Sequence, residues 1–203
     1  MKTIGIMGGM GPLAAARLFE RIVLLTKAGC DNEHIPMIID NNTNIPDRTQ
    51  AILNNGKNPV PELVRSALRL ELMGADAIII ACNTAHYFYD EIVKFVKIPV
   101  INMIEETGRY ILKDDPAVKC AGLLATEGTC ASGIYKKVFE KLGLELVIPE
   151  VEEQRHITDL IYGIKEGRED MNPENIIRVV SALKKRGADV MVLGCTELPI
   201  AFG

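Results

Sequence analysis

One stretch of this chain occurs twice, and it limits what the chain can fold into. Residues 74–84 read GADAIIIACNT, and residues 187–197 read GADVMVLGCTE. Both copies open with Gly-Ala-Asp, continue through four apolar residues and one small residue, and reach a cysteine, Cys82 or Cys195. The spacing is constant, because 187 minus 74 and 195 minus 82 both give 113. A repeat of this kind predicts two halves of equivalent structure.

Each copy of the repeat predicts a helix, a tight turn, a buried strand and a loop. Amphipathic helical patterns begin at Pro61-Glu62 and Pro173-Glu174 and run to the Gly-Ala-Asp of each copy. The short apolar run that follows is typical of a parallel strand buried on both faces. In open parallel α/β sheets, ligands bind at the carboxyl ends of the strands. We therefore expect Cys82 and Cys195 to follow equivalent strands and to face one cleft.

The remaining segments fit the same two-part scheme. The start, Lys2-Thr-Ile-Gly-Ile-Met-Gly, matches the stretch from Lys119 at an offset of 117. Strands are expected over 3–7, 35–40, 77–81, 98–101, 118–126, 144–148 and 190–194. Helices are expected over 13–27, 61–73, 87–96, 131–142, 152–167 and 173–186, with a crossover helix from 102 and irregular structure over 50–60. The fold class is α/β, with two pseudo-symmetric domains, 1–103 and 104–203. Each is a parallel sheet flanked by helices, and the active site lies in the cleft between them.

Composition excludes several classes of protein. The chain is 48% hydrophobic and 25% charged, as ordinary globular proteins are. A net charge of −4 argues against a partner that is a nucleic acid. No apolar run approaches the length of about 20 residues that spans a membrane. The apolar run after Met1 is too short for a signal peptide, so we expect a cytoplasmic protein.

The cysteines do not form a disulfide framework. There are five, an odd number, and none is part of a Cys-x-x-Cys motif. The three histidines are scattered, so no metal site is expected. Cys30 and Cys120 are expected to be small buried side chains, and Cys130, near a predicted helix start, is expected to be inert.

A glycine-rich loop follows the first predicted strand. Gly8-Gly-Met-Gly-Pro12 allows a tight turn and close approach to a ligand, and Pro12 suits the first position of a helix. The helix N-terminus then offers N–H groups to an anion. The loop also matches part of a dinucleotide fingerprint, but Asp40, which closes the next strand, lies 31 residues after Gly9 instead of about 20. We therefore favour a smaller anion over a nucleotide.

A polar run, Asp40-Asn41-Asn42-Thr43-Asn44, follows the second predicted strand. Such a loop is placed to contact substrate, although a single asparagine in a loop is more often a solvated surface residue. Arg48 follows shortly after, and its guanidinium can bind a carboxylate through two hydrogen bonds.

Three motifs together resemble the aspartate/glutamate racemase family: Gly8-Gly-Met-Gly-Pro12, Ala81-Cys-Asn-Thr-Ala-His86 and Leu193-Gly-Cys-Thr-Glu-Leu-Pro199. The resemblance covers the whole chain. Glutamate racemases usually carry Asp-Ser-Gly after the first strand and Cys-Thr-His at the second cysteine, so the residues here favour the aspartate branch. The resemblance implies two pseudo-symmetric α/β domains, a homodimer, and racemisation of an acidic amino acid without a cofactor such as pyridoxal phosphate.

The resemblance also implies roles for individual residues. Cys82 and Cys195 are the expected catalytic pair. The expected substrate-binding residues are Met10, Arg48, Asn83, Thr84, Thr126, Lys165, Thr196 and Glu197. Arg48 and Lys165 would neutralise the substrate carboxylates. Glu197 would hold the second cysteine loop or contact the substrate ammonium, and a surface or capping role for it fits the sequence equally well. Family members usually continue with a helix that packs back on the first domain. Because this chain ends at Gly203, we expect that helix to be absent. Either the sequence is truncated, or the cleft is less well closed than in other family members.

The chemistry of racemisation explains why two cysteines are needed. A proton leaves Cα from one face and another is added to the opposite face, which two thiols can achieve. The ordinary thiol pKa of about 8.5 is lowered by helix N-termini and by nearby cations, and acid–base catalysis is most effective when the pKa lies near the working pH. The resulting carbanion needs preorganised hydrogen-bond donors, which Asn83, Thr84 and Thr196 could supply.

Two other functions remain open at this point. One keeps the fold and changes the substrate, as in a hydantoin racemase or a relative of maleate isomerase. The other is a non-catalytic protein that binds or senses a small anion. The pair of cysteines fits every enzymatic alternative, whereas Arg48 and Lys165 favour an acidic amino acid.

Overall fold

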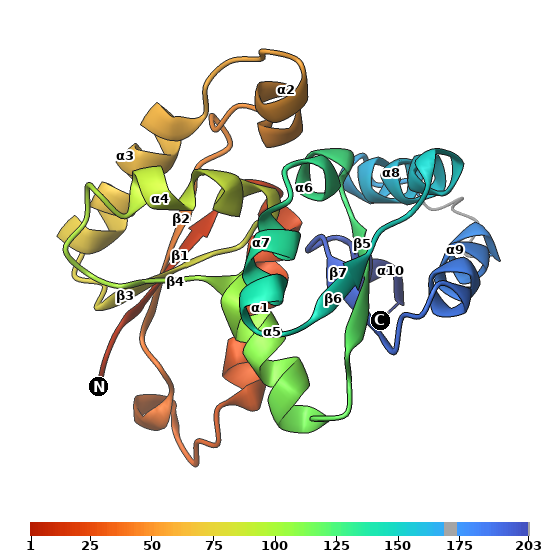
Figure 1. The fold of residues 1–203 in the computed structure, drawn as a ribbon. Coiled ribbons are helices and arrows are strands. Elements are labelled where there is room, and N and C mark those ends of the chain that lie inside the picture. The colour runs from red at the N-terminus through yellow and green to blue at the C-terminus, as the bar shows by residue number, and fades with distance from the viewer. Residues whose placement is uncertain (169–173, 203) are drawn as a thin grey trace. The chain divides into compact units, whose positions relative to one another are not determined.

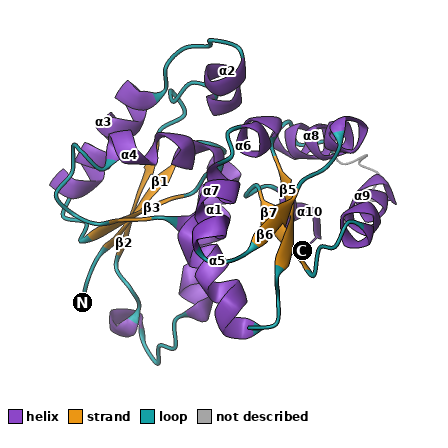
Figure 2. Cartoon of the chain, viewed as in Figure 1, coloured by secondary structure: helices purple, strands orange, loops and turns teal. Residues whose placement is uncertain are grey.

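The computed structural model describes residues 1–168 and 174–202. The chain divides into two compact units, Met1–Met103 and Ile104–Gly203, which we describe separately (Figure 1). In each unit helices lie around a parallel sheet (Figure 2). The predicted α/β class with parallel, helix-flanked sheets is confirmed. In the described part of the chain, no helix combines the length and hydropathy needed to cross a bilayer.

Unit 1 contains a four-stranded sheet with the strand order β2-β1-β3-β4. Its strands are β1 (Ile4–Gly8), β2 (Met37–Asn41), β3 (Ala77–Ile80) and β4 (Val100–Ile101). Its helices are α1 (Pro12–Leu25), η1 (Asp31–Glu33), α2 (Arg48–Leu53), α3 (Val60–Leu72), η2 (Thr84–Phe88) and α4 (Tyr89–Ile92), where η marks a 3₁₀ helix. Helix α5 (Met103–Asp114) begins at the last residue of this unit and continues into unit 2.

Unit 2 contains a three-stranded sheet with the strand order β6-β5-β7. Its strands are β5 (Cys120–Ala125), β6 (Glu145–Val147) and β7 (Val190–Gly194). Its further helices are α6 (Glu127–Ala131), α7 (Ile134–Lys141), α8 (Val151–Lys165), α9 (Glu174–Lys185) and α10 (Leu198–Phe202). The predicted helix start at Pro173 and the chain end at Gly203 lie outside the described residues.

The two sheets pair their strands in the same register. In unit 1, Ile4 lies opposite Ala77, and in unit 2, Ala121 lies opposite Val190. These two pairs are related by the offsets of 117 and 113 found in the sequence. Strand order is also equivalent, because β2-β1-β3 corresponds to β6-β5-β7. The internal repeat therefore corresponds to a repeated strand arrangement.

The glycine of each Gly-Ala-Asp ends the preceding helix. Gly74 has a φ of +93° and Gly187 a φ of +98°, values that favour glycine. The N–H of the next residue bonds back into the last helical turn in both copies, from Ala75 to Leu70 O at 3.0 Å and from Ala188 to Leu183 O at 3.1 Å. This hydrogen bond is typical of a left-handed helix cap.

The aspartate of each copy sets the register of the following strand. The Asp76 N–H donates to Thr3 O at 2.8 Å, while its carboxylate accepts from Thr3 N at 2.7 Å. Asp189 likewise donates to Cys120 O at 2.9 Å and accepts from Lys119 N and Cys120 N, each at 2.9 Å. The Gly-Ala-Asp sequence thus positions each cysteine-bearing strand beside the first strand of its unit.

The sheet of unit 1 is covered on both faces. Met7, Ile78 and Ile80 face the buried side chains of α3, whereas Ile6 faces α1 through Ala15. This burial on two faces explains why β1 and β3 are almost entirely apolar. In unit 2, α8 and α9 pack on one face of the sheet, where Leu124, Ile161 and Val179 belong to one core cluster with Cys195.

Two segments of unit 1 differ from the prediction. Residues 48–53, partly inside the stretch expected to be irregular, form helix α2, because Asp47 caps it by accepting a hydrogen bond from Gln50 N at 2.8 Å. The helix expected over 87–96 is instead the 3₁₀ helix η2 followed by the single turn α4. His86 of η2 bonds to the backbone of the first cysteine loop, at Cys82 O.

Two further segments are shorter or interrupted. The helix expected over 131–142 is divided into α6 and α7 at Gly133, whose φ of +67° cannot continue a right-handed helix. Strand β4 covers only Val100–Ile101 of the expected 98–101, since Pro99 has no N–H with which to extend the pairing.

Candidate active site

Cys82 lies two residues beyond the end of β3, in a loop whose side chains are buried. Its exposed fraction is 5%, and Asn83 and Thr84 are 6% and 5% exposed. Thr84 begins η2, against which α2 packs. The three residues therefore lie together at the carboxyl end of the sheet, as the sequence predicts for a site in a parallel α/β fold.

His86 holds this loop through both of its ring nitrogens. Nδ1 lies 2.9 Å from Cys82 O, and Nε2 accepts a hydrogen bond from Met103 N at 3.2 Å. Because Nε2 is an acceptor, the ring proton belongs on Nδ1, which donates to Cys82 O. Burial lowers the pKa of His86 below its ordinary value, so the ring is neutral. The ring also stacks on Tyr89, with centroids 6.3 Å apart.

The glycine-rich loop after β1 lies against the loop after β2. A Cβ on Gly9 would come within 2.3 Å of the Asn42 backbone, and φ at Gly9 is +89°, so only glycine fits. Asn42 is itself buried, and its amide nitrogen donates to Ser66 Oγ at 3.1 Å and to Glu62 Oε2 at 3.2 Å. The polar run after β2 is therefore partly a packed structural element, not only a solvated loop.

Arg48 joins the same region from the first turn of α2. Its Nη2 donates to Met10 O at 3.2 Å, and its Nη1 donates to Pro46 O at 3.0 Å and Ile45 O at 3.5 Å. Arg48 is only 7% exposed and Met10 only 2%. Two predicted substrate-binding residues are thus in contact with each other, and Arg48 is not a surface arginine. Met10 and Cys82 belong to one core cluster.

Cys195 immediately follows β7 in unit 2. Its Sγ donates a hydrogen bond to Glu197 Oε2 at 2.9 Å, and Thr196 Oγ1 donates to the same oxygen at 3.3 Å. Cys195 and Glu197 are 6% and 3% exposed. The Leu198 N–H donates to Cys195 O at 3.1 Å, which closes the turn before α10. All three predicted residues of this motif therefore form one hydrogen-bonded group.

The electrostatic environment of Cys195 differs from the expectation. Burial raises the pKa of the Cys195 thiol well above its ordinary value, and the charge and hydrogen bond of Glu197 raise it further. Lys165 lowers that pKa but does not outweigh the other two causes. We expected a nearby cation to lower the thiol pKa. Burial, together with the adjacent carboxylate, reverses the expected direction of the pKa shift.

Lys165 and Thr126 complete the predicted set within unit 2. Lys165 ends α8, is exposed, and places Nζ 5.2 Å from the centroid of the Tyr162 ring. Thr126 is 3% exposed and caps α6, where its Oγ1 accepts from Thr129 N at 3.2 Å. The structure therefore places Lys165 within electrostatic reach of Cys195, while the hydroxyl of Thr126 has a structural role.

The other three cysteines have different environments. Cys30 is exposed, so the expectation that it is a buried side chain is wrong: it lies in an irregular segment ahead of η1. Cys120 is 7% exposed, as expected. Cys130 donates to Gln154 Oε1 at 3.5 Å, and burial, with a smaller effect of Glu127, raises its pKa to about 12. Such a thiol is a poor nucleophile or base, which agrees with the expected inertness.

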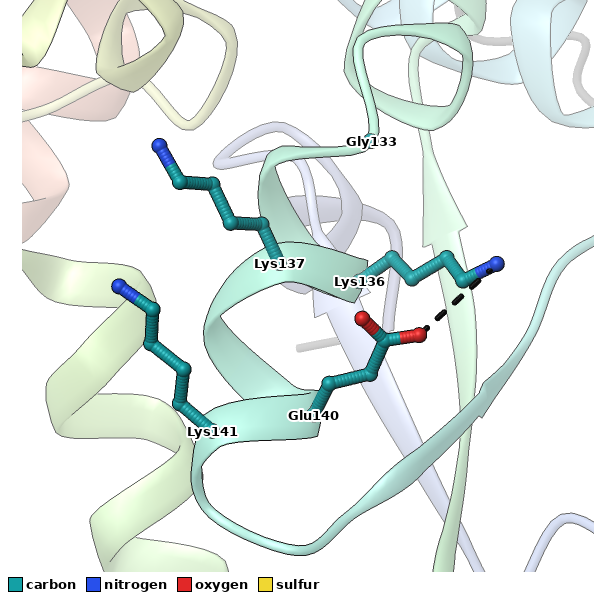
Figure 3. A pocket seen from close by; sticks show the side chains of 5 residues that line it. All are labelled: Gly133, Lys136, Lys137, Glu140 and Lys141. Atoms are coloured by element: carbon teal, nitrogen blue, oxygen red, sulfur yellow. Dashed lines mark ion pairs between the residues drawn. The ribbon is translucent and has the colours of Figure 1, made fainter.

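Two cavities in unit 2 lie apart from these residues. One, of about 490 Å³, is lined by Gly133 and side chains of α7. Figure 3 shows Lys137 and Lys141 extending to one side, while Lys136 pairs with Glu140 at 3.8 Å on the other. The second, of about 620 Å³, lies along α8 and includes Tyr162. None of the predicted site residues lines either cavity. Within the described ranges 1–168 and 174–202, no group of three His, Cys, Asp or Glu side chains is arranged to hold a metal ion.

Sequence reasoning missed the part that His86 plays. It placed His86 in the first cysteine loop but gave it no role. The available signal was its spacing, four residues after Cys82, which places a ring nitrogen near Cys82 O when the loop makes one helical turn. The contact with Met103 could not be found in this way, because it depends on where α5 begins.

Comparison with known proteins gives a consistent result. The family described as Asp/Glu/hydantoin racemase matches residues 7–202. The broad specificity amino-acid racemase RacX of Bacillus subtilis (strain 168) is 29% identical over 198 residues, which cover 96% of this chain and 85% of the relative. The glutamate racemase of Corynebacterium kroppenstedtii is 30% identical over 153 residues, which cover 73% of this chain and 52% of that relative. The matched part is thus about half the length of that glutamate racemase.

Solved structures show the same similarity. The aspartate racemase of Picrophilus torridus has a TM-score of 0.86 and 34% sequence identity, covering 98% of this chain and 83% of that chain. PH1733, an aspartate racemase homologue from Pyrococcus horikoshii OT3, has a TM-score of 0.78 and 28% identity, covering 99% of this chain and 88% of that chain.

Proposed function

This chain belongs to the Asp/Glu/hydantoin racemase family, and from that premise we propose that it interconverts the L and D forms of aspartate. As a member of a racemase family it is an isomerase. The proposed reaction uses Cys82 and Cys195 as the two acid–base groups and requires no cofactor, because two thiols can supply both the base and the acid.

One observation carries the proposal. Each unit ends an equivalent strand, in the same register, with a buried cysteine followed by two polar residues. A protein that merely tolerated cysteine in its core would not need to repeat it at the same position, followed each time by polar residues. Two thiols at equivalent positions suit a reaction that adds and removes a proton on opposite faces of one carbon.

The residues around the thiols support an anionic substrate. Asn83, Thr84 and Thr196 carry side-chain donors of the kind that stabilise a carboxylate whose negative charge grows in the transition state. Arg48 and Lys165 supply positive charge, one in each unit. The similarity to the aspartate racemase of Picrophilus torridus favours aspartate over glutamate among the acidic amino acids.

A second candidate is a racemase with a wider range of substrates. It is favoured by the match to RacX, which covers nearly the whole chain and whose name describes broad specificity. Such an enzyme would use the same thiols and would depend less on Arg48 and Lys165. A panel of L-amino acids with acidic, neutral and basic side chains would separate the two candidates.

The test is loss of optical activity from L-aspartate in the presence of dialysed protein. We expect racemic aspartate as the end point, with no requirement for added pyridoxal phosphate or metal. The variant Cys30→Ser is the matched control, because it removes an exposed thiol outside the proposed site. Absence of racemisation of every amino acid tested would contradict the proposal. The expected homodimer and cytoplasmic location stay predictions, and sedimentation equilibrium would test the first.

A further inference from the structure

The two cysteines have different neighbours in the structure. Cys195 Sγ donates to Glu197 Oε2 at 2.9 Å, and both side chains are almost fully buried. Counting back 113 residues from Glu197 leads to Thr84, a neutral residue two positions after Cys82. The two copies therefore share the cysteine and a neutral polar residue after it, Asn83 or Thr196, but differ in charge two residues after the cysteine, where one unit has a carboxylate and the other a hydroxyl.

Other titratable groups also face Cys195 from the elements packed around it. Lys165 on α8 is positive and favours the thiolate. Tyr135 on α7 is 2% exposed and interacts electrostatically with both Cys195 and Cys130, while burial raises its pKa, so it is neutral. Glu197 accepts the thiol proton in a hydrogen bond. The protonated thiol is the form that this geometry stabilises.

We propose that Glu197 is a positioning residue that keeps Cys195 protonated in the free enzyme, so that Cys195 is the acid and Cys82 the base in the form that first meets substrate. This inference rests on the proposed racemase function. In this protonation state the free enzyme reacts directly with the enantiomer whose Cα–H faces Cys82.

One turnover transfers two protons, one to Cys82 and one from Cys195. The Cys82 thiolate takes the proton from Cα, so the C–H bond breaks, an S–H bond forms, and the electron pair is delocalised into the substrate carboxylate. The Cys195 S–H bond then breaks as its proton is added to the opposite face of Cα. Cys195 is left as a thiolate beside the Glu197 carboxylate. Because these two negative charges repel, the free enzyme returns to its starting form by taking a proton on Cys195 and losing one from Cys82.

This asymmetry has a kinetic signature. L- and D-aspartate have equal free energies in water, so the two values of kcat/KM must be equal. If the free enzyme prefers one enantiomer, kcat therefore differs between L- and D-aspartate, and KM differs between them by the same factor. In Glu197→Gln we expect the ratio of the two kcat values to change at least threefold, while the ratio of the two kcat/KM values stays at one.

A direct test measures the thiols and does not depend on catalysis. Each cysteine is alkylated with iodoacetamide between pH 6 and pH 10 and quantified by peptide mass spectrometry, with the exposed Cys30 as an internal reference for the reagent. In Glu197→Gln we expect Cys195 to react at least tenfold faster at pH 8, with Cys82 unchanged. Glu152→Gln, which removes an exposed carboxylate elsewhere in unit 2, should change neither rate.

A reciprocal variant, Thr84→Glu, tests the inference if Glu197→Gln does not fold. Thr84→Glu places a carboxylate beside Cys82 and should slow its alkylation at least tenfold without affecting Cys195. Equal Cys195 rates in the wild type and Glu197→Gln, or an unchanged Cys82 rate in Thr84→Glu, would overturn the inference. If the wild type racemises aspartate while these rates fail to shift, only this inference fails. If the rates shift but no amino acid is racemised, the proposed function fails instead.

Discussion

His86 accepts a hydrogen bond from the Met103 N–H through Nε2, at 3.2 Å, while its Nδ1 lies 2.9 Å from Cys82 O. Met103 is the last residue of unit 1 and the first residue of α5, the helix that continues into unit 2. One imidazole thus connects the loop of the first cysteine to the start of the crossover helix. The position of Cys82 depends on a ring that must remain neutral, since a proton on Nε2 would abolish its role as an acceptor.

The first prediction concerns this ring. His86→Gln should retain at most one of the two hydrogen bonds, and leaving a buried backbone group unsatisfied costs about 1–3 kcal/mol. We expect a lower free energy of unfolding and a larger loss of kcat than of substrate affinity, because Cys82 would be misplaced. Urea denaturation and steady-state racemisation kinetics measure the two effects. His156→Gln, at an exposed position of α8, is the matched control and should behave as the wild type.

A second prediction follows from the lowered pKa of His86. Above about pH 6.5, the ordinary histidine pKa, the ring is neutral in both the folded and the unfolded protein. As the pH falls below that value, the unfolded state takes up a proton that the folded state resists, so the free energy of unfolding falls. The loss continues until the pH reaches the lowered folded-state pKa. Denaturation curves at pH 7.5 and pH 5.5 should show a larger decrease for the wild type than for His86→Gln. Equal decreases would show that His86 is not the group responsible.

The third prediction concerns Asp189, whose pKa is lowered by hydrogen bonds from Lys119 N and Cys120 N. The ionised carboxylate stabilises the folded protein above the ordinary aspartate pKa, and this contribution disappears as the pH falls through the lowered folded-state pKa. Asp189→Asn should therefore be less stable than the wild type at pH 7, and the difference should shrink towards pH 3. Thermal unfolding at both pH values measures it. A difference that is independent of pH would mean that charge is not the cause.

Much of the arrangement could be predicted from the sequence, and the reason is the repeat. Gly-Ala-Asp has a local physical basis in both copies: the glycine adopts a positive φ and the aspartate bonds to the neighbouring strand. The alanine of each copy also has a local physical basis, because it packs against a glycine of the neighbouring strand. A Cβ added to Gly5 would lie 3.0 Å from the Cβ of Ala75, and one added to Gly122 would lie 3.1 Å from the Cβ of Ala188. A pattern with these local causes predicts the strand that follows it, and therefore the position of each cysteine.

Other features depend on contacts between distant segments and could not be predicted in this way. The segment after Cys82 has a helical sequence, yet it forms a 3₁₀ helix and a single turn, because His86 bonds to Cys82 and Met103, and Tyr89 Oη donates to Val100 O at 2.7 Å. The burial of Arg48 depends on the approach of the Met10 loop. The raised pKa of Cys195 depends first on how deeply the loop is buried and then on the direction that the Glu197 side chain takes, and the sequence alone specifies neither.

The fourth prediction concerns Arg48 and the charge of the substrate. A hydrogen bond to a charged group contributes about 1.5–3 kcal/mol, so Arg48→Met should lower kcat/KM for aspartate roughly ten- to a hundredfold. Because Arg48 also donates to three backbone carbonyls, we expect a lower melting temperature as well. Arg48→Lys separates the two effects: it retains the positive charge but cannot reproduce the three hydrogen bonds. If Arg48→Met is destabilised but racemises aspartate as fast as Arg48→Lys, then Arg48 only supports the loop.

The last prediction concerns the division of labour between Cys82 and Cys195. Each racemisation needs one base and one acid, so Cys82→Ser or Cys195→Ser should abolish it. The remaining cysteine can still remove the Cα proton from the enantiomer that presents it. In heavy water, each variant should therefore incorporate deuterium into only one enantiomer of aspartate, and the two variants should have opposite preferences.

A mechanism with a single base predicts a different outcome of that experiment. One serine variant would be inactive in every assay, and the other would retain racemisation. Deuterium incorporation into L- and D-aspartate, followed by mass spectrometry for both variants, decides between the mechanisms. Cys130→Ser is a suitable control, because the high pKa of Cys130 leaves its thiol inert. Racemisation at the wild-type rate by both Cys82→Ser and Cys195→Ser would show that neither thiol is catalytic, and the repeated strand and loop would then serve only to build the fold.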